Sequence, residues 1–105
     1  MSTLSTHVLD TSLGRPAGGV GVVLSGGDGP LAEAVTDADG RIGSLGGELE
    51  PGTYHLRFDS GGYFAARGTE GFYPEVLVTF SISGAAHVHV PLLLSQFGYS
   101  TYRGS

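Results

Sequence analysis

Short stretches in which apolar and polar residues alternate recur along the chain at roughly ten-residue spacing, separated by Gly, Pro and Asp. The 19 glycines among 105 residues suit many turns and bends. About seven or eight short strands follow, which is typical of an all-β, two-sheet antiparallel β-sandwich. We expect a single domain over residues 1–105, because no linker, internal repeat or low-complexity tail divides the chain.

The alternation places the expected strands at residues 4–10, 20–24, 31–36, 52–59, 75–82, 87–90 and 92–94. The stretch 31–36 is the least clear, since its Ala and Glu also suit a half-helix. The last strand is expected to break at Pro91, because proline inside a strand marks an edge or a bulge. The only plausible helix is 62–67. In the first strand, one face carries Leu4, Thr6 and Val8, and the other carries Ser5, His7 and Leu9.

The charge pattern excludes several classes of protein. The net charge is −5, and the five basic residues are all Arg, spread along the chain without a cluster. A nucleic-acid footprint is therefore not expected. Without Lys there is no Schiff-base chemistry and no phosphate-binding P-loop. Only 14% of the residues are charged, and a surface poor in charge often lies partly under other subunits.

The absence of Cys removes thiol nucleophiles, disulfides and thiolate metal ligands together. No apolar run approaches membrane-spanning length, and the Met-Ser-Thr start lacks the features of a signal peptide. A cytoplasmic enzyme or binding module is therefore expected. The chain has no Gly-x-Ser-x-Gly motif, which excludes a serine hydrolase of the α/β type. It also has no βαβ unit with a Gly-x-Gly-x-x-Gly motif, which excludes a dinucleotide-binding enzyme.

Three residues at strand or turn exits could carry chemistry: His7, Arg41 and His89. Taken singly, each is more often structural. Together they suit general-base hydrolysis, in which one His takes a proton from water, Arg binds a carbonyl or an anion, and the second His orients or donates. The polar tail at 102–105 is expected to fold back into a cleft beside them.

A zinc site is the alternative interpretation of the histidines. His87 and His89 share one face of a strand, and His7 or His55 could supply a third ligand. The lack of Cys and of an obvious carboxylate second shell weighs against this site. His55 is better explained as a solvated strand residue beside Arg57 and Asp59. The paired carboxylates of the loops, such as Asp37 and Asp39, are likewise typical of solvated turns.

Several motifs resemble one known family. They are LSTHVLDTSxGRPA from Leu4, Asp-Gly-Arg at 39–41, FYPEV at 72–76, HVPLLLS at 89–95 and YSTYRGS at the end. In order and spacing these resemble the 5-hydroxyisourate hydrolases, the transthyretin-related family of urate breakdown, from Leu4 to Ser105. The terminal Tyr-Arg-Gly-Ser is the most specific of the matches. Gln96, where the family commonly has Pro, is the main departure near the tail.

The resemblance implies a two-sheet sandwich with one short helix, assembled as a homotetramer whose active sites lie at the dimer–dimer interface. Carried over by motif, the catalytic residues are His7, Arg41 and His89. His87 matches a position that is often, but less strictly, His in the family, so it is left out of the catalytic set. The substrate-binding residues implied are His7, Arg41, Tyr102, Arg103, Gly104 and Ser105.

The implied reaction is hydrolysis of a ring amide of 5-hydroxyisourate, giving 2-oxo-4-hydroxy-4-carboxy-5-ureidoimidazoline. His7 and His89 would position and deprotonate water, and Arg41 would stabilise the oxyanion. Which histidine is the base stays open, and no metal or organic cofactor is implied. A transthyretin-like carrier of a small aromatic ligand is the alternative, and an interaction module appended to larger proteins is a third possibility.

Overall fold

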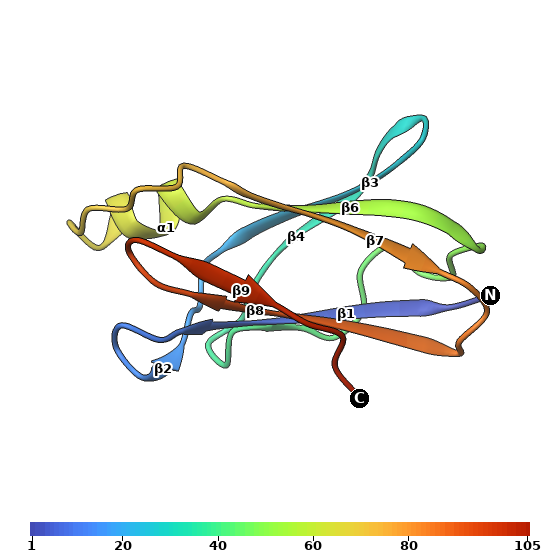
Figure 1. The fold of residues 1–105 in the computed structure, drawn as a ribbon, viewed down its shortest axis with the longest axis horizontal. Coiled ribbons are helices and arrows are strands. Elements are labelled where there is room, and N and C mark those ends of the chain that lie inside the picture. Colours follow the sequence, from blue (N-terminus) through green and yellow to red (C-terminus); the bar gives the residue numbers. More distant parts are fainter.

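Two β-sheets face each other, with one short helix at one end of the sandwich (Figure 1). The computed structural model describes residues 1–105. One sheet has the strand order β2-β1-β8-β9, with β5 beside β1, and the other has the order β4-β3-β6-β7. The strands are β1 (Thr3–Asp10), β2 (Arg15–Pro16), β3 (Gly21–Gly26), β4 (Gly29–Val35), β5 (Arg41–Ile42), β6 (Gly52–Phe58), β7 (Val76–Ile82), β8 (His87–Leu94) and β9 (Tyr99–Thr101).

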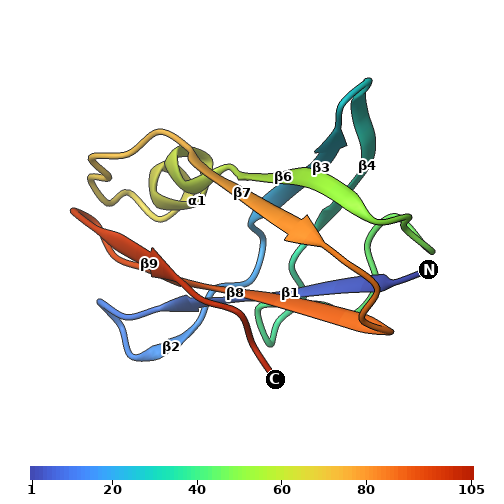
Figure 2. The ribbon, with the colours of Figure 1, turned by 45° about the vertical axis from the view of Figure 1, so that its right-hand side comes forward.

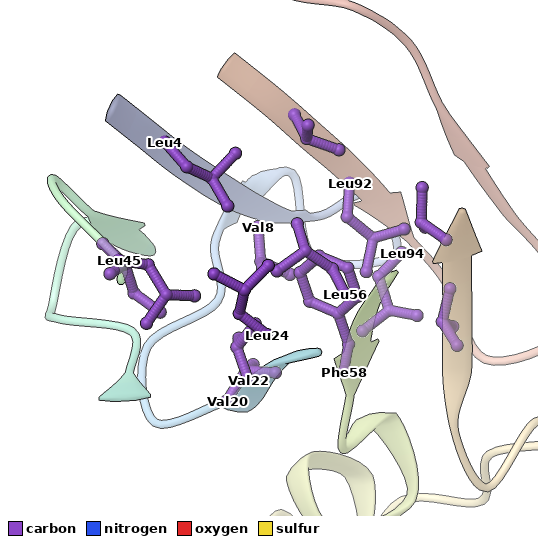
Figure 3. Packing of buried hydrophobic residues seen from close by; sticks show 14 of the residues in the cluster. Leu4, Val8, Val20, Val22, Leu24, Leu45, Leu56, Phe58, Leu92 and Leu94 are labelled. Carbon is purple, nitrogen blue, oxygen red and sulfur yellow. The ribbon is translucent and has the colours of Figure 1, made fainter. Parts of the chain in front are cut away.

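The core lies between the sheets and is made mainly by alternate residues of the strands, with loop and helix residues such as Leu45 and Phe64 added to it (Figure 3). Leu24, Leu56 and Phe58 of one sheet meet Val8 and Leu92 of the other, and all five are fully buried. Each such side chain stabilises the fold by about 1.5–3 kcal/mol relative to exposure. The same alternation leaves the other half of each strand's side chains on the outer faces.

The predicted sandwich is confirmed, with one pair of strands that departs from the antiparallel pattern. β1 and β8 run parallel over their whole length, from Thr3 opposite His87 to Asp10 opposite Leu94. The remaining strand pairs are antiparallel. The parallel pair joins the beginning of the chain to its last long strand, so residues more than eighty positions apart become neighbours.

The expected break at Pro91 is wrong, because β8 runs through it between β1 and β9. The Pro91 carbonyl faces β9 and accepts a 2.7 Å hydrogen bond from Thr101 Oγ1. An N–H at Pro91 would point to the same side, where β9 ends at Thr101. The missing donor therefore coincides with the end of β9, not with a break in β8.

The helix α1 (Ser60–Ala66) begins two residues before the predicted start at 62. Asp59, predicted as the end of a strand, is instead the N-cap, and its Oδ1 accepts the Gly62 N–H at 3.0 Å. The ambiguous stretch 31–36 forms a strand, β4. Residues 15–16, which lie outside the expected strands, form the two-residue strand β2. At seven residues, α1 is too short to cross a membrane.

The chain after β8 is tied to the connection between α1 and β7, and Figure 2 shows these two loops side by side. Phe72 N donates to Gln96 O at 2.8 Å, and Gln96 Nε2 donates to Glu70 O at 3.1 Å. Tyr73 and Tyr99 pack edge to face, with ring centroids 5.1 Å apart. Gln96 thus fixes the turn that leads into β9 and the tail.

A buried polar pair joins the helix to β1. Tyr63 Oη donates to Asp10 Oδ2 at 2.7 Å, and both residues are buried. Burial, followed by the hydrogen bond to Asp10, raises the pKa of Tyr63 to about 12. The other Asp10 oxygen, Oδ1, accepts the Leu13 N–H at 3.1 Å.

Tyr63→Phe is expected to lower the free energy of unfolding by about 1–3 kcal/mol, because the variant leaves a buried carboxylate oxygen without its donor. Urea denaturation measures this loss. Tyr54→Phe is the matched control, since Tyr54 donates to Glu50 O in an exposed setting. It should cost at most about 1 kcal/mol. Equal losses in the two variants would contradict the structural role given to the buried pair.

Candidate functional site

Three histidines lie on the outer face of the sheet that contains β1 and β8. In β1, Leu4, Thr6 and Val8 are buried, so Ser5 and His7, which were predicted to share the other face, point outward. In β8, Val88 and Val90 are buried, and His87 and His89 therefore face the same way. The register places Ser5 opposite His89 and Thr3 opposite His87.

Arg41 is brought to this face by the turn before it. Asp37 Oδ1 accepts the backbone N–H groups of Asp39 and Arg41, each at 2.9 Å. Gly40 has φ +73°, and a Cβ there would lie 2.3 Å from Val8 O, so only glycine fits. Arg41 then pairs with His7 across β5 and β1. Because its neighbour Ile42 is buried, the exposed Arg41 points outward, beside His7.

The tail passes directly against His89. After β9 ends, the chain turns toward the outer side of the β1–β8–β9 sheet (Figure 2), and Gly104 N donates to His89 O at 2.8 Å. A Cβ on Gly104 would lie 2.5 Å from His89 Cδ2. A glycine at 104 therefore lets the tail and the imidazole ring occupy adjacent space, and Ser105 follows at the edge of the cavity described next.

A polar cavity of about 460 Å³ lies at this face. Its lining includes Ser5, Arg41, His87, His89 and Ser105. The structure therefore brings together three of the residues singled out in the sequence: Arg41, His89 and Ser105. His7 is the register partner of Arg41 on the same face but does not line this cavity within one chain.

Tyr102 and Arg103 lie apart from this cavity. They line a mostly apolar cavity of about 280 Å³ at the edge of the sandwich, with Val78 and Phe80 of β7 and Val88 of β8. Both tail residues are exposed. A single chain thus does not unite all the residues that the family resemblance assigns to substrate binding, and their roles stay predictions.

Hydrogen bonds fix the orientation of each ring. His7 Nε2 lies 2.9 Å from Asp39 O, and because a carbonyl oxygen only accepts, that nitrogen carries the proton. His89 Nδ1 lies 2.7 Å from Ser5 Oγ. The same Ser5 oxygen lies 2.7 Å from His87 Nε2, and His87 Nδ1 lies 2.6 Å from Thr3 Oγ1.

The surroundings of His89 favour its neutral form. Burial is the largest cause that lowers the pKa of His89 below its ordinary 6.5, followed by electrostatic repulsion of its charged form by Arg41, His7 and His87. A hydrogen bond with the Ser5 backbone acts in the opposite direction. At neutral pH the ring is therefore uncharged and has one nitrogen able to accept a proton.

The zinc interpretation finds little support in the geometry. No group of three or more His, Cys, Asp or Glu side chains is placed to hold a metal ion. His55, one of the expected third ligands, lies on β6 in the opposite sheet, where its Nδ1 is 2.9 Å from Thr79 Oγ1. Both ring nitrogens of His87 are engaged by hydroxyl groups.

A larger cavity, of about 620 Å³, opens on the outer face of the other sheet. Its charged lining residues are Glu33, Arg57 and Asp59, and it contains no histidine. Arg57 lies 4.0 Å from Glu75 with both side chains about half exposed. The lining of this larger cavity contains no histidine, whereas the smaller cavity is lined by His87 and His89 beside Arg41, so the smaller cavity is the better candidate for acid–base chemistry.

The sequence did not point to Ser5 as a site residue, and His87 was left out of the predicted catalytic set. The signal for Ser5 was present, because alternation had already placed Ser5 and His7 on one face. The parallel neighbour β8 was not predictable from alternation, so the contacts of Ser5 with His87 and His89 were not foreseen.

Comparison with known proteins agrees with these features. Residues 4–104 match the sequence model of the HIUase/Transthyretin family. The chain belongs to this family. A relative, the 5-hydroxyisourate hydrolase of Salmonella dublin, is 50% identical over 109 residues, covering 97% of this chain and 80% of the relative. The family predicted from the motifs is thus confirmed.

Solved structures of the HIUase/Transthyretin family share the sandwich. The Klebsiella pneumoniae 5-hydroxyisourate hydrolase aligns with a TM-score of 0.93 at 45% identity, covering 99% of this chain and 100% of that chain. Sea bream transthyretin in complex with thyroxine aligns with a TM-score of 0.89 at 34% identity, covering 96% of this chain and 93% of the transthyretin chain. The fold is therefore common to a hydrolase and to a protein that binds thyroxine, and the site must decide between them.

Arg41→Gln is expected to raise the pKa of His89 toward its ordinary value, because the variant removes a positive charge that disfavours the imidazolium. An NMR titration of the histidine ring protons measures this shift. Arg57→Gln, on the opposite sheet, is the control and should leave the pKa of His89 unchanged. A pKa that stays fixed or falls in Arg41→Gln would show that the two groups are not coupled.

Proposed function

We propose that this chain is a 5-hydroxyisourate hydrolase, which opens the six-membered ring of its substrate to give 2-oxo-4-hydroxy-4-carboxy-5-ureidoimidazoline. One observation carries the proposal: a neutral imidazole, His89, and a guanidinium, Arg41, line the same polar cavity, and the Gly104–Ser105 tail closes against them. Membership of the family and 50% identity to a hydrolase of that name support it.

The chemistry follows from these groups. A neutral histidine takes a proton from water as the water oxygen attacks the ring carbonyl, and the carbonyl oxygen becomes an oxyanion. The Arg41 guanidinium stabilises that charge by hydrogen bonds that strengthen as it develops. Collapse of the tetrahedral intermediate breaks the ring C–N bond, and the protonated histidine returns its proton to the leaving nitrogen. His7, the neighbour of Arg41, orients the water or the substrate.

The proposal includes a homotetramer whose active sites lie at the dimer–dimer interface. Its support is that Arg41, Tyr102 and Arg103 are all exposed in one chain, and that Tyr102 and Arg103 line a cavity other than that of His89. A neighbouring chain would cover this face and bring further tail residues to the substrate. Arg103 and Ser105 would then hold the urea-like edges of the ring. The cytoplasmic location expected from the sequence stays a prediction.

A carrier function like that of thyroxine-binding transthyretin is the alternative within the same fold. A carrier needs an apolar channel for an aromatic ligand. The face described here instead presents three imidazoles, a guanidinium and several hydroxyls, which suit a polar, hydrolysable substrate.

We expect the protein to accelerate the decay of freshly generated 5-hydroxyisourate, followed by its ultraviolet absorbance. His89→Ala and Arg41→Ala should each lower kcat/KM by a factor of about 10² or more, the usual loss for a general base or an oxyanion donor. His55→Ala, on the opposite sheet, is the control and should keep wild-type activity. Near wild-type turnover in either site variant would overturn the roles assigned to His89 and Arg41. An inactive wild-type protein would exclude the hydrolase function and favour the carrier function.

Gly104→Ala should lower kcat by about tenfold or more, because a Cβ at 104 would lie 2.5 Å from His89 Cδ2 and must displace the ring or the tail. Gly27→Ala, where no atom lies within 4 Å of the added Cβ, is the matched control. Removing residues 102–105 should abolish activity and leave the circular dichroism spectrum of the fold. Unchanged kinetics in these two tail variants would exclude the tail from the site.

A further inference from the structure

Four polar side chains form a continuous hydrogen-bonded chain along the outer face of β1 and β8. It runs from Thr3 Oγ1 to His87 Nδ1 at 2.6 Å, from His87 Nε2 to Ser5 Oγ at 2.7 Å, and from Ser5 Oγ to His89 Nδ1 at 2.7 Å. The parallel register creates the chain by placing Thr3 opposite His87 and Ser5 opposite His89. It ends at His89, which lines the cavity together with Arg41 and Ser105 and whose backbone carbonyl accepts the Gly104 N–H.

Ser5 Oγ either accepts from both rings, which places the His89 proton on Nδ1, or donates its one proton to one ring and accepts from the other. In the second case His87, with one ring proton and bonded at both nitrogens, passes this direction on to Thr3, and the chain has two orientations. In one orientation every hydrogen bond donates toward His89, and the ring proton of His89 then lies on Nε2. In the other orientation every hydrogen bond donates away from His89, and its ring proton lies on Nδ1.

The charge in the cavity selects between the two orientations. Arg41 lines the same cavity as His89 and lowers its pKa. A lone pair on Nε2 is attracted by the guanidinium, whereas an N–H at that atom would meet another donor. At the other end of the chain, Ala86 O lies 3.5 Å from Thr3 Oγ1 and offers an acceptor for the last proton. Both ends favour the orientation that points away from His89.

Resting on the proposed function, we propose that Ser5 is a positioning residue, which accepts the Nδ1 proton of His89 and so keeps the Nε2 lone pair directed at water in the cavity. This assigns the general base to His89. His7 donates its Nε2–H to Asp39 O. Ser5 and Gly104 hold opposite edges of the His89 ring, one at Nδ1 and one at Cδ2.

The assignment also explains how the protonated base is stabilised. When Nε2 takes a proton from water, Nδ1 keeps its own, and Ser5 Oγ still accepts from the imidazolium while donating to His87. No atom of the chain has to reorient during this step, so the arrangement is ready before reaction. Without the serine hydroxyl, the ring is free to place its proton on Nε2, where it can no longer act as a base.

The test combines a tautomer measurement with kinetics on the assembled protein. Long-range ¹⁵N–¹H correlation of histidine-labelled protein at neutral pH should show His89 as the Nδ1–H tautomer in wild type and a shift toward Nε2–H in Ser5→Ala. Ser5→Ala should lower kcat by about 10- to 100-fold with KM nearly unchanged. Its kcat/KM profile should move its acid limb to lower pH, because the imidazolium has lost an acceptor.

Ser5→Thr keeps the hydroxyl and should restore most of kcat, and Ser12→Ala, an exposed serine of the turn after β1, is the control. An Nε2–H tautomer in wild type, or wild-type kcat and pH profile in Ser5→Ala, would overturn the assignment while leaving the hydrolase function in place. An inactive wild-type protein would remove the function, and the tautomer measurement would then still confirm or overturn the hydrogen-bond direction.

Discussion

The parallel pairing of β1 with β8 is the constraint on which the site depends. It holds eight residues of each strand in one register, and Thr6 Oγ1 reinforces it by donating to Val90 O at 2.6 Å inside the core. A slip of one residue would turn every side chain of a strand to the opposite face. His7 and Ser5 would then enter the core, and Leu4 and Val8 would reach solvent. The free energy of core burial therefore also maintains the alignment of the site.

The same two strands serve stability and chemistry through alternate residues. Val88 and Val90 pack inward, while His87 and His89, which alternate with them, face the cavity. A site on strands in the middle of a packed sheet has little freedom to distort. The more adaptable parts are the turn that presents Arg41 and the tail that reaches His89, and each depends on a glycine where a side chain would collide with the backbone or the ring.

Much of the fold and part of the site could be predicted from sequence. Alternation placed His7 on one face with Ser5, opposite Leu4 and Val8, and the Asp-Gly-Arg motif placed Arg41 at a turn exit, because these features are local. The parallel contact of β1 with β8 joins Ser5 to His89 across 84 positions and has no local signal. The break expected at Pro91 failed for the same reason: whether a missing N–H matters depends on the neighbouring strand, and β9 ends at that point.

The histidines differ in what their surroundings permit. His55 resembles the others in sequence but lies on the opposite sheet beside Thr79, whereas His89 is partly buried among positive charges and hydroxyls. The family fold alone accommodates both hydrolysis and ligand carriage, so these local differences carry the functional argument.

A crystal structure of the assembled protein with a non-hydrolysable cyclic ureide analogue tests the central claim most directly. The account predicts the analogue on the β1–β8 face, with a carbonyl oxygen in hydrogen-bonding distance of the Arg41 guanidinium and an ordered water or its mimic at His89 Nε2. An analogue bound instead in the larger cavity over β3, β4 and β6, with the His89 face empty, would contradict it.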